Sequence, residues 1–291
     1  MNTNVYQMVT DRIIEQMQQG IIPWHQPWAG GSAMAISYTT RKPYSILNQF
    51  LLGRPGEWIT WPQVQALGGH VRKGAKSRFC VFFKPLEEKA SEPTPEGEEE
   101  PNRKFRFVLR WYNVFHLSDV EGIDSKLESV VANPGLQPIE AAESVIAGYL
   151  EREQSLKFIC DRQSNSAYYS PSEDMVVVPM LSQYEIPEEY YSTAFHEFTH
   201  STMAESRCDR RSESRITRFG DTDYSREELV AEIGSAMLCN RIGIENAKAF
   251  KNSAAYIQGW LRSLQNDPRM IVWASGRAEE AARYILGETA A

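Results

Sequence analysis

The pattern His196-Glu197-x-x-His200 constrains this chain of 291 residues more than any other stretch. On an α-helix, residues four apart share a face, so both histidines can bind one metal ion from the same side. Glu197 lies one position round, where it can take a proton from a water beside that ion and pass it to a leaving amine. The alternative for so short a pattern is a helix whose histidines are ordinary core or surface residues.

The surroundings of the pattern favour the metal site. Pro187 and two glutamates precede it, and such residues are typical of a helix start. The apolar run 174–180 comes before that helix, and we expect it to be an edge strand that pairs with an extended peptide. A second predicted helix carries Glu228 and Glu232 four residues apart, hence on one face, and offers a third ligand.

The two glutamates are expected to divide two roles, a third metal ligand and a carboxylate that holds a ligand histidine. We predict Glu228 as the ligand and Glu232 as the supporting carboxylate or the alternative ligand. Glu228 has a competing interpretation, because with Ser225 it forms Ser-x-x-Glu, which is typical of a capping box at a helix start. Zinc is the ion that this set of donors predicts.

Other residues near the motif carry less weight. Tyr224 could stabilise an oxyanion, but a tyrosine there is more often a packing residue. Five arginines follow the motif helix among acids, and a solvated loop is the expected structure for them: Arg207, Arg210, Arg211, Arg215 and Arg218. The four cysteines form no Cys-x-x-Cys pair, which argues against disulfides and against a zinc finger.

The net charge of −7 conceals a difference between the two ends of the chain. Residues 1–115 contain 14 Lys/Arg and 10 Asp/Glu, and seven of those acids lie in residues 87–100. Without that acidic run and its single lysine, the region carries 13 bases against 3 acids, as expected of a nucleic-acid-binding surface. Segment 86–102, rich in Glu, Pro and Gly, is predicted to be a disordered loop.

Five of the seven tryptophans lie in the same basic region, and bases interleaved with aromatics are typical of single-strand binding. The candidate DNA-binding residues are Trp24, Trp28, Arg41, Lys42, Arg72, Lys73, Lys76, Arg78, Arg106 and Arg110. Trp24 and Trp28 are expected to be accessible beside glycine turns, whereas Phe79, Phe83 and Phe107 are expected to fill the core first. No recognition helix for duplex DNA is evident.

The order of the predicted elements indicates an α+β protein with two domains, 1–125 and 136–291. In the first domain, two strands are expected to form a long hairpin around the acidic loop. No run approaches 18 apolar residues, which argues against a membrane span. A reducing cytoplasm is the expected location.

Six segments, in order along the chain, resemble the ArdC-type antirestriction proteins of conjugative plasmids. They are PWHQPW, PYSILNQFLL, WITWPQVQALGGHVRKGAKS, WYNVFHLSDVEGI, HEFTH and REELVAEIGSAML. The front half is also similar to the N-terminal region of TraC-type plasmid primases. The resemblance covers nearly the whole chain. It implies a small mixed α/β single-stranded-DNA-binding domain followed by a zincin-like metallopeptidase domain.

The resemblance also implies a function and its residues. Zinc would be held by His196, His200 and a gluzincin-like third ligand, and Glu197 would be catalytic. We expect a protein that binds single-stranded DNA without sequence preference and protects incoming plasmid DNA from host restriction, with restriction-modification proteins as candidate targets. The alternative is a DNA-binding shield whose zinc is structural or vestigial. Glu197 favours the first, because a purely structural zinc would not require it.

Overall fold

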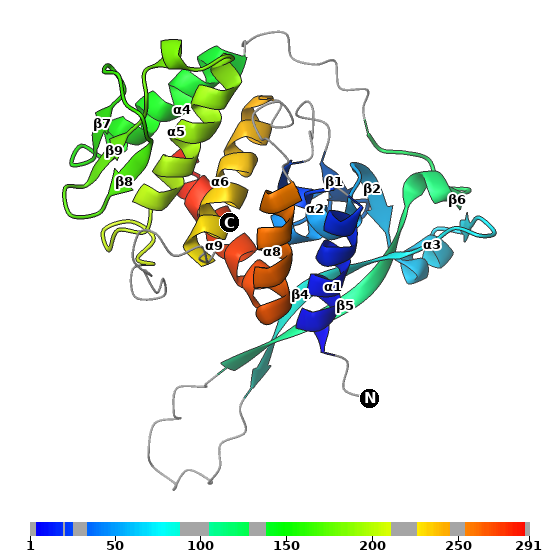
Figure 1. Ribbon diagram of the computed structural model, residues 1–291. Coiled ribbons are helices and arrows are strands. Elements are labelled where there is room, and N and C mark those ends of the chain that lie inside the picture. Colours follow the sequence, from blue (N-terminus) through cyan, green and yellow to red (C-terminus); the bar gives the residue numbers. More distant parts are fainter. Residues whose placement is uncertain are drawn as a thin grey trace, which may run out of the picture.

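The computed structural model describes residues 4–19, 21–25, 34–87, 105–127, 138–210, 226–244 and 254–288. Several residues singled out above lie outside this range: Trp28, Tyr224, Ser225, Arg211, Arg215, Arg218 and residues 88–102 of the acidic segment. The backbone of Arg106 is described, whereas its side chain is not. Within the described residues the chain mixes helices and sheets, as the α+β prediction requires (Figure 1).

The front of the chain packs helices on a four-stranded sheet of order β1-β2-β5-β4. Strands β1 and β2 are parallel and the other neighbours are antiparallel. The strands are β1 (Ala35–Ser37), β2 (Gly56–Ile59), β4 (Arg78–Glu87) and β5 (Phe105–His116). The helices are α1 (Val5–Gln18), η1 (Pro23–His25), α2 (Ile46–Leu52), α3 (Trp61–Ala66) and η2 (Leu117–Asp119). A separate two-stranded ladder pairs β3 (His70–Val71) with β6 (Val120–Glu121).

Strands β4 and β5 form the long hairpin that the sequence predicts, with pairing that runs out to Glu87 opposite Phe105. The first two residues of the expected loop, Leu86 and Glu87, therefore belong to β4. Phe79 packs against the core, but Phe83 and Phe107 are 53% and 64% exposed, so the expectation that these two fill the core is wrong. The paired strands run on past the buried part of the sheet, which leaves these aromatics without cover.

The rear of the chain combines a three-stranded sheet with a group of helices. The strands are β7 (Lys157–Ile159), β8 (Tyr168–Ser170) and β9 (Met175–Val177). The helices are α4 (Pro138–Arg152), η3 (Leu181–Gln183), α5 (Pro187–Ser201), α6 (Arg226–Ile242), α8 (Ala254–Asn266) and α9 (Met270–Leu286). The strand order is β7-β9-β8, so the expectation that the run 174–180 is a free edge is wrong. Both sides of β9 are already paired with a neighbouring strand.

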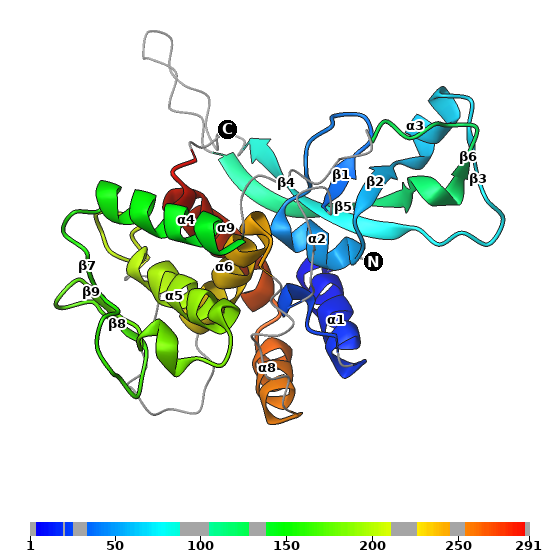
Figure 2. The ribbon, with the colours of Figure 1, turned by 90° about the horizontal axis from the view of Figure 1, so that it is seen from above.

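One hydrophobic core joins the two ends of the chain. The N-terminal helix α1 contributes a stripe at four-residue spacing, Val5, Val9, Ile13 and Met17, and the same core includes apolar residues of α6, α8 and α9. Figures 1 and 2 both show α6 and α9 between α5 on one side and α1 and α2 on the other. The two predicted domains are therefore joined by a common core as well as by the chain between them.

The tryptophan pair at the centre of that core contradicts one expectation. Trp24 is fully buried, with its ring centroid 6.1 Å from that of Trp260 and the two rings nearly perpendicular. The predicted exposure of Trp24 is therefore wrong, because a partner more than two hundred residues away covers it. Nearby, the Thr10 hydroxyl donates a hydrogen bond of 2.8 Å to the carbonyl oxygen of Pro268. Among the helices of the described segments, none combines the length and apolar character that crossing a membrane requires.

The shared core predicts that a substitution in the rear of the chain destabilises the front. Trp260→Ala should lower the free energy of unfolding by about 3–5 kcal/mol, because it leaves a cavity against Trp24. Trp61, which is 46% exposed, supplies the control, and Trp61→Ala should cost at most about 1 kcal/mol. Hydrogen exchange of the α1 amides should accelerate in Trp260→Ala and not in Trp61→Ala. Unchanged α1 protection in Trp260→Ala would show that the two halves are independent.

Candidate metal centre

Helices α5 and α6 build the site where they cross. Gly234 on α6 faces Thr199 on α5 so closely that a Cβ atom there would lie 2.6 Å from Thr199 Cγ2. Next to it, the Ser235 hydroxyl donates a 2.7 Å hydrogen bond to the Ser192 carbonyl oxygen. Small residues at the crossing therefore let the backbones approach. A glycine inside a predicted helix is a signal of close packing, so the sequence itself marks Gly234 as a packing position.

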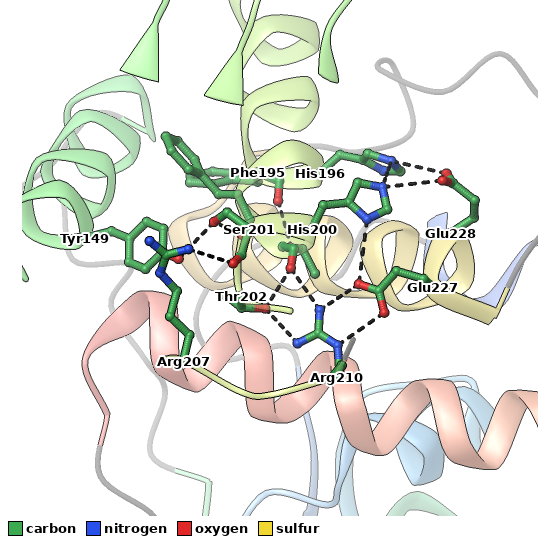
Figure 3. A network of polar contacts seen from close by, with 12 residues as sticks. Tyr149, Phe195, His196, His200, Ser201, Thr202, Arg207, Arg210, Glu227 and Glu228 are labelled. Atoms are coloured by element: carbon green, nitrogen blue, oxygen red, sulfur yellow. Dashed lines mark hydrogen bonds and ion pairs between the residues drawn. The ribbon is translucent and has the colours of Figure 1, made fainter. Parts of the chain in front are cut away.

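The crossing brings three predicted site residues together. Figure 3 shows His196 and His200 on α5 pointing toward Glu228 on α6. The Nε2 atoms of the histidines lie 3.1 Å apart, and each lies 3.5 Å from a carboxylate oxygen of Glu228. In the part of the chain that the structure describes, these three form the group whose ligand atoms all lie within 4.8 Å of one another.

The spacing of these donors fits a zinc ion. Nitrogen and oxygen ligands at about 2.0–2.1 Å in a tetrahedral arrangement stand about 3.3 Å from one another. The observed separations of 3.1 to 3.5 Å match that value without movement of the backbone. Two imidazoles and one carboxylate also leave a fourth position, as catalytic zinc sites do.

The other two predicted site residues, Glu197 and Glu232, lie on the same two helices but outside the donor group. Glu197 follows His196 on α5, and its residue exposure is only 7%. Glu232 lies one turn after Glu228 on α6 and is outside the three-residue group, so the geometry favours Glu228 as the third ligand. Whether Glu232 supports a ligand histidine stays a prediction. A carboxylate that the sequence analysis overlooked, Glu227, lies 3.6 Å from His200 Nδ1.

The charges around His200 oppose the effect of its burial. Burial alone lowers the pKa of a histidine, but the carboxylates of Glu227 and Glu228, helped by Glu197, raise the pKa of His200 to about 10. In the same way, His196 first and then His200 hold the pKa of Glu228 well below its usual range. Carboxylates therefore face both ring nitrogens of His200, and the negative potential that they create favours the binding of a cation at this site.

Two arginines expected in a solvated loop are instead buried. The side chains of Arg207 and Arg210 are both 0% exposed. Arg207 pairs with Glu153 and Asp174 at 2.8 and 2.7 Å, and it donates to the Ser201 carbonyl oxygen at the end of α5. The expectation for this pair is wrong, because acidic side chains of other segments and carbonyl oxygens of the last turn of α5 compensate their charges.

The predicted DNA-binding residues fall into two groups. Three arginines are engaged within the fold: Arg41 with the buried carboxylate of Glu57, Arg72 with Glu121, and Arg78 with the Leu52 carbonyl oxygen and the face of Trp58. The second group consists of exposed residues whose side chains form no hydrogen bond or ion pair with another described residue. They are Lys42, Lys73, Lys76 and Arg110.

An exposed patch surrounds Arg110, and it contains one residue, Phe82, that was not predicted from the sequence. Arg110 on β5 is paired with Phe82 on β4, so their side chains share a face of the hairpin, and Lys84 lies two residues further along that face. Phe82 is 43% exposed and its ring lies 5.7 Å from that of Tyr112. We call Phe82, Lys84 and Arg110 the hairpin patch. Residues 79–83 are all apolar, so the sequence offers no polar/apolar alternation that would have marked Phe82 as exposed.

Comparisons with known proteins agree with this architecture. Residues 152–277 match the family model described as a zincin-like metallopeptidase, and residues 3–115 match that of the N-terminal domain of anti-restriction factor ArdC. The crystal structures of the antirestriction ArdC protein from plasmid R388 are similar over the whole chain. The metal-free form has a TM-score of 0.72 at 29% identity, covering 99% of this chain and 100% of that one. The Mn(II)-bound form has 0.72 at 30% identity, covering 98% of each chain.

Two curated relatives extend the comparison. The chain is 31% identical to a DNA primase TraC of Escherichia coli over 97% of its own length, but it spans only 27% of that protein. It is 30% identical to the uncharacterized protein y4eC of Sinorhizobium fredii, and there it covers 92% of the relative.

The fold and the three-donor group thus define a protein with a zincin-like metallopeptidase domain. Divalent-metal binding follows from that class and from the donor spacing, and zinc is the ion that fits. The chain belongs to the ArdC antirestriction protein family.

The close approach at Gly234 predicts a sensitive position. Gly234→Ala forces α5 and α6 apart, so it should lower the free energy of unfolding by about 1–3 kcal/mol and weaken zinc binding. Gly276 in α9 has open space around it, and Gly276→Ala should be neutral or stabilise by up to about 1 kcal/mol. Denaturant unfolding and chelator competition for zinc measure both quantities. Equal zinc affinity in the two variants would mean that the donors do not depend on the crossing.

Proposed function

We propose that this protein protects plasmid DNA from host restriction in the bacterial cytoplasm. In this proposal the rear of the chain is a zinc-dependent peptidase and the front binds single-stranded DNA without sequence preference. The observation that carries this proposal is the donor group of His196, His200 and Glu228, with Glu197 on the same helix as the two histidines. Family membership supports the role, because a relative similar along the whole chain is named an antirestriction protein.

The rear site has the parts that hydrolysis of a peptide bond needs. A bound zinc ion supplies Lewis acidity, which makes water nucleophilic near neutral pH. Glu197, adjacent to a ligand and nearly buried, is the base that would take the proton of that water and return it to the leaving amine. His196, His200 and Glu228 would hold the ion and use up three of its four positions. Restriction-modification proteins are the candidate substrates.

The hairpin patch is the part of the front best suited to single-stranded DNA. An accessible aromatic ring can stack on any base, and cations beside it can bind phosphates. Phe82 supplies the ring, and Lys84 and Arg110 supply cations that no other described residue neutralises. Lys73 and Lys76, exposed in the turn before β4, extend the positive charge. Arg41, Arg72 and Arg78 are less suited, because acids or carbonyls of the fold already bind them.

The DNA-binding proposal predicts a difference between the two faces of the hairpin. Phe82→Ala with Lys84→Ala and Arg110→Ala should weaken binding to a single-stranded oligonucleotide. The lost stacking should cost about 1–3 kcal/mol. The plot of log K against log salt should also become less steep, its negative slope losing about 1.4 in magnitude for two lost phosphate contacts. The matched control, Phe83→Ala with Phe107→Ala, removes exposed aromatics from the opposite face. If both variants bind like the parent, DNA lies elsewhere.

The peptidase proposal predicts that restriction protection needs Glu197. Glu197→Gln should retain about one zinc per chain and lose protection of incoming DNA, because it removes the base and leaves the ligands in place. His196→Ala should lose zinc, and Glu185→Gln, in the exposed loop before α5, should behave like the parent. Full protection by Glu197→Gln would favour the alternative function, a DNA-binding shield with a structural zinc.

A further inference from the structure

Arg210 links the two helices that carry the metal donors. Its guanidinium donates to the carbonyl oxygen of Thr199, in the last turn of α5, at 3.0 Å and to the hydroxyl of Thr202, the residue that follows the helix, at 2.7 Å. Through Nη2 and Nε it also binds both carboxylate oxygens of Glu227, in the first turn of α6, at 2.7 and 3.2 Å. A bidentate contact of this kind fixes the orientation of the carboxylate as well as its distance from the guanidinium.

The oriented carboxylate faces a metal donor. Glu227 Oε1, the oxygen that Arg210 Nη2 binds, lies 3.6 Å from Nδ1 of His200. The opposite nitrogen of that ring, Nε2, is the one directed at Glu228 and His196. Figure 3 shows this line of contacts from Arg210 through Glu227 to His200.

We propose that Arg210 and Glu227 are positioning residues that set the ring orientation and tautomer of His200 for metal binding. A carboxylate beside Nδ1 favours the form with the proton on that nitrogen, which leaves the lone pair of Nε2 free for the ion. Arg210 keeps the carboxylate in place and compensates its charge. The inference rests on the ligand set proposed above, and it assigns the supporting role on His200 to Glu227.

Arg207 provides an internal comparison. Its side chain is 0% exposed, as is that of Arg210, and it also binds a carbonyl oxygen at the end of α5 and pairs with acids. Its partners, Glu153 and Asp174, are not members of the group His196, His200 and Glu228, and neither lies on α6. A purely structural role for buried arginines at the end of α5 therefore predicts equal effects at both positions, whereas positioning predicts an effect on metal binding at Arg210 alone.

The test measures zinc affinity of the full chain by chelator competition, together with Tm. Glu227→Gln should weaken zinc binding by about 10–100-fold, as removal of a carboxylate behind a ligand histidine does in other sites. Arg210→Lys should weaken zinc binding about tenfold, because a lysine cannot make a bidentate contact with the carboxylate. Arg207→Lys should lower Tm comparably and leave zinc affinity within about twofold of the parent.

Two further variants keep the proposal open to refutation. If Glu227→Gln fails to fold, Arg210→Met with Glu227→Leu removes both charges of the buried pair together and should fold with zinc affinity reduced at least about tenfold. A folded Glu227 variant that binds zinc within about threefold of the parent overturns the proposal alone. Retention of zinc by His200→Ala overturns it together with the ligand set.

Discussion

The packing of α5 against α6 is the constraint on which the metal site depends. Neither helix carries all three members of the donor group, since α5 supplies the two imidazoles and α6 supplies the carboxylate of Glu228. They reach one another because Gly234 has no side chain to keep Thr199 away. Arg210 then joins the end of α5 to the start of α6, close to the donors. The site is thus a property of a helix pair, and anything that separates the pair separates its ligands.

Helix α6 connects this site to the front of the molecule. Its first turn carries Glu227 and Glu228, while Leu229, Val230 and Ile233 lie in the core shared with α1 and Trp24. The proposed DNA-binding hairpin contributes Val81 and Leu109 to the same core. DNA held by the hairpin patch would therefore be held by the same folded body that carries the metal site. For a protein proposed to act on restriction enzymes, this arrangement brings the peptidase site and the DNA together.

The sequence predicts those parts of the molecule that depend on local spacing. Four-residue spacing on a helix places His196 and His200 on one face and offers Glu228 or Glu232 as their partner, and a run of β-branched and aromatic residues predicts the hairpin. The predictions that fail depend on distant partners. Trp24 is buried because Trp260 covers it, and β9 is no edge because β7 and β8 flank it. No local pattern indicates either contact.

Buried charge was the hardest feature to predict. A run of arginines among acids is usually a solvated loop, and only the folded arrangement of Glu227, Glu153 and Asp174 makes burial of two of them favourable. Glu227 itself was overlooked beside Glu228, because adjacent residues on a helix point in different directions and only Glu228 shares a face with Glu232. Which neighbour each carboxylate meets depends on how α6 is rotated against α5.

Zinc-edge X-ray absorption of the zinc-loaded protein tests the central claim most directly. If the crossing of α5 and α6 builds the site, the ion has two imidazole ligands, and its other nearest neighbours are oxygens, all at about 2.0–2.2 Å. Glu228→Ala should change the oxygen shell and preserve both imidazoles. A sulfur ligand at about 2.3 Å, or any number of imidazoles other than two, would contradict the account.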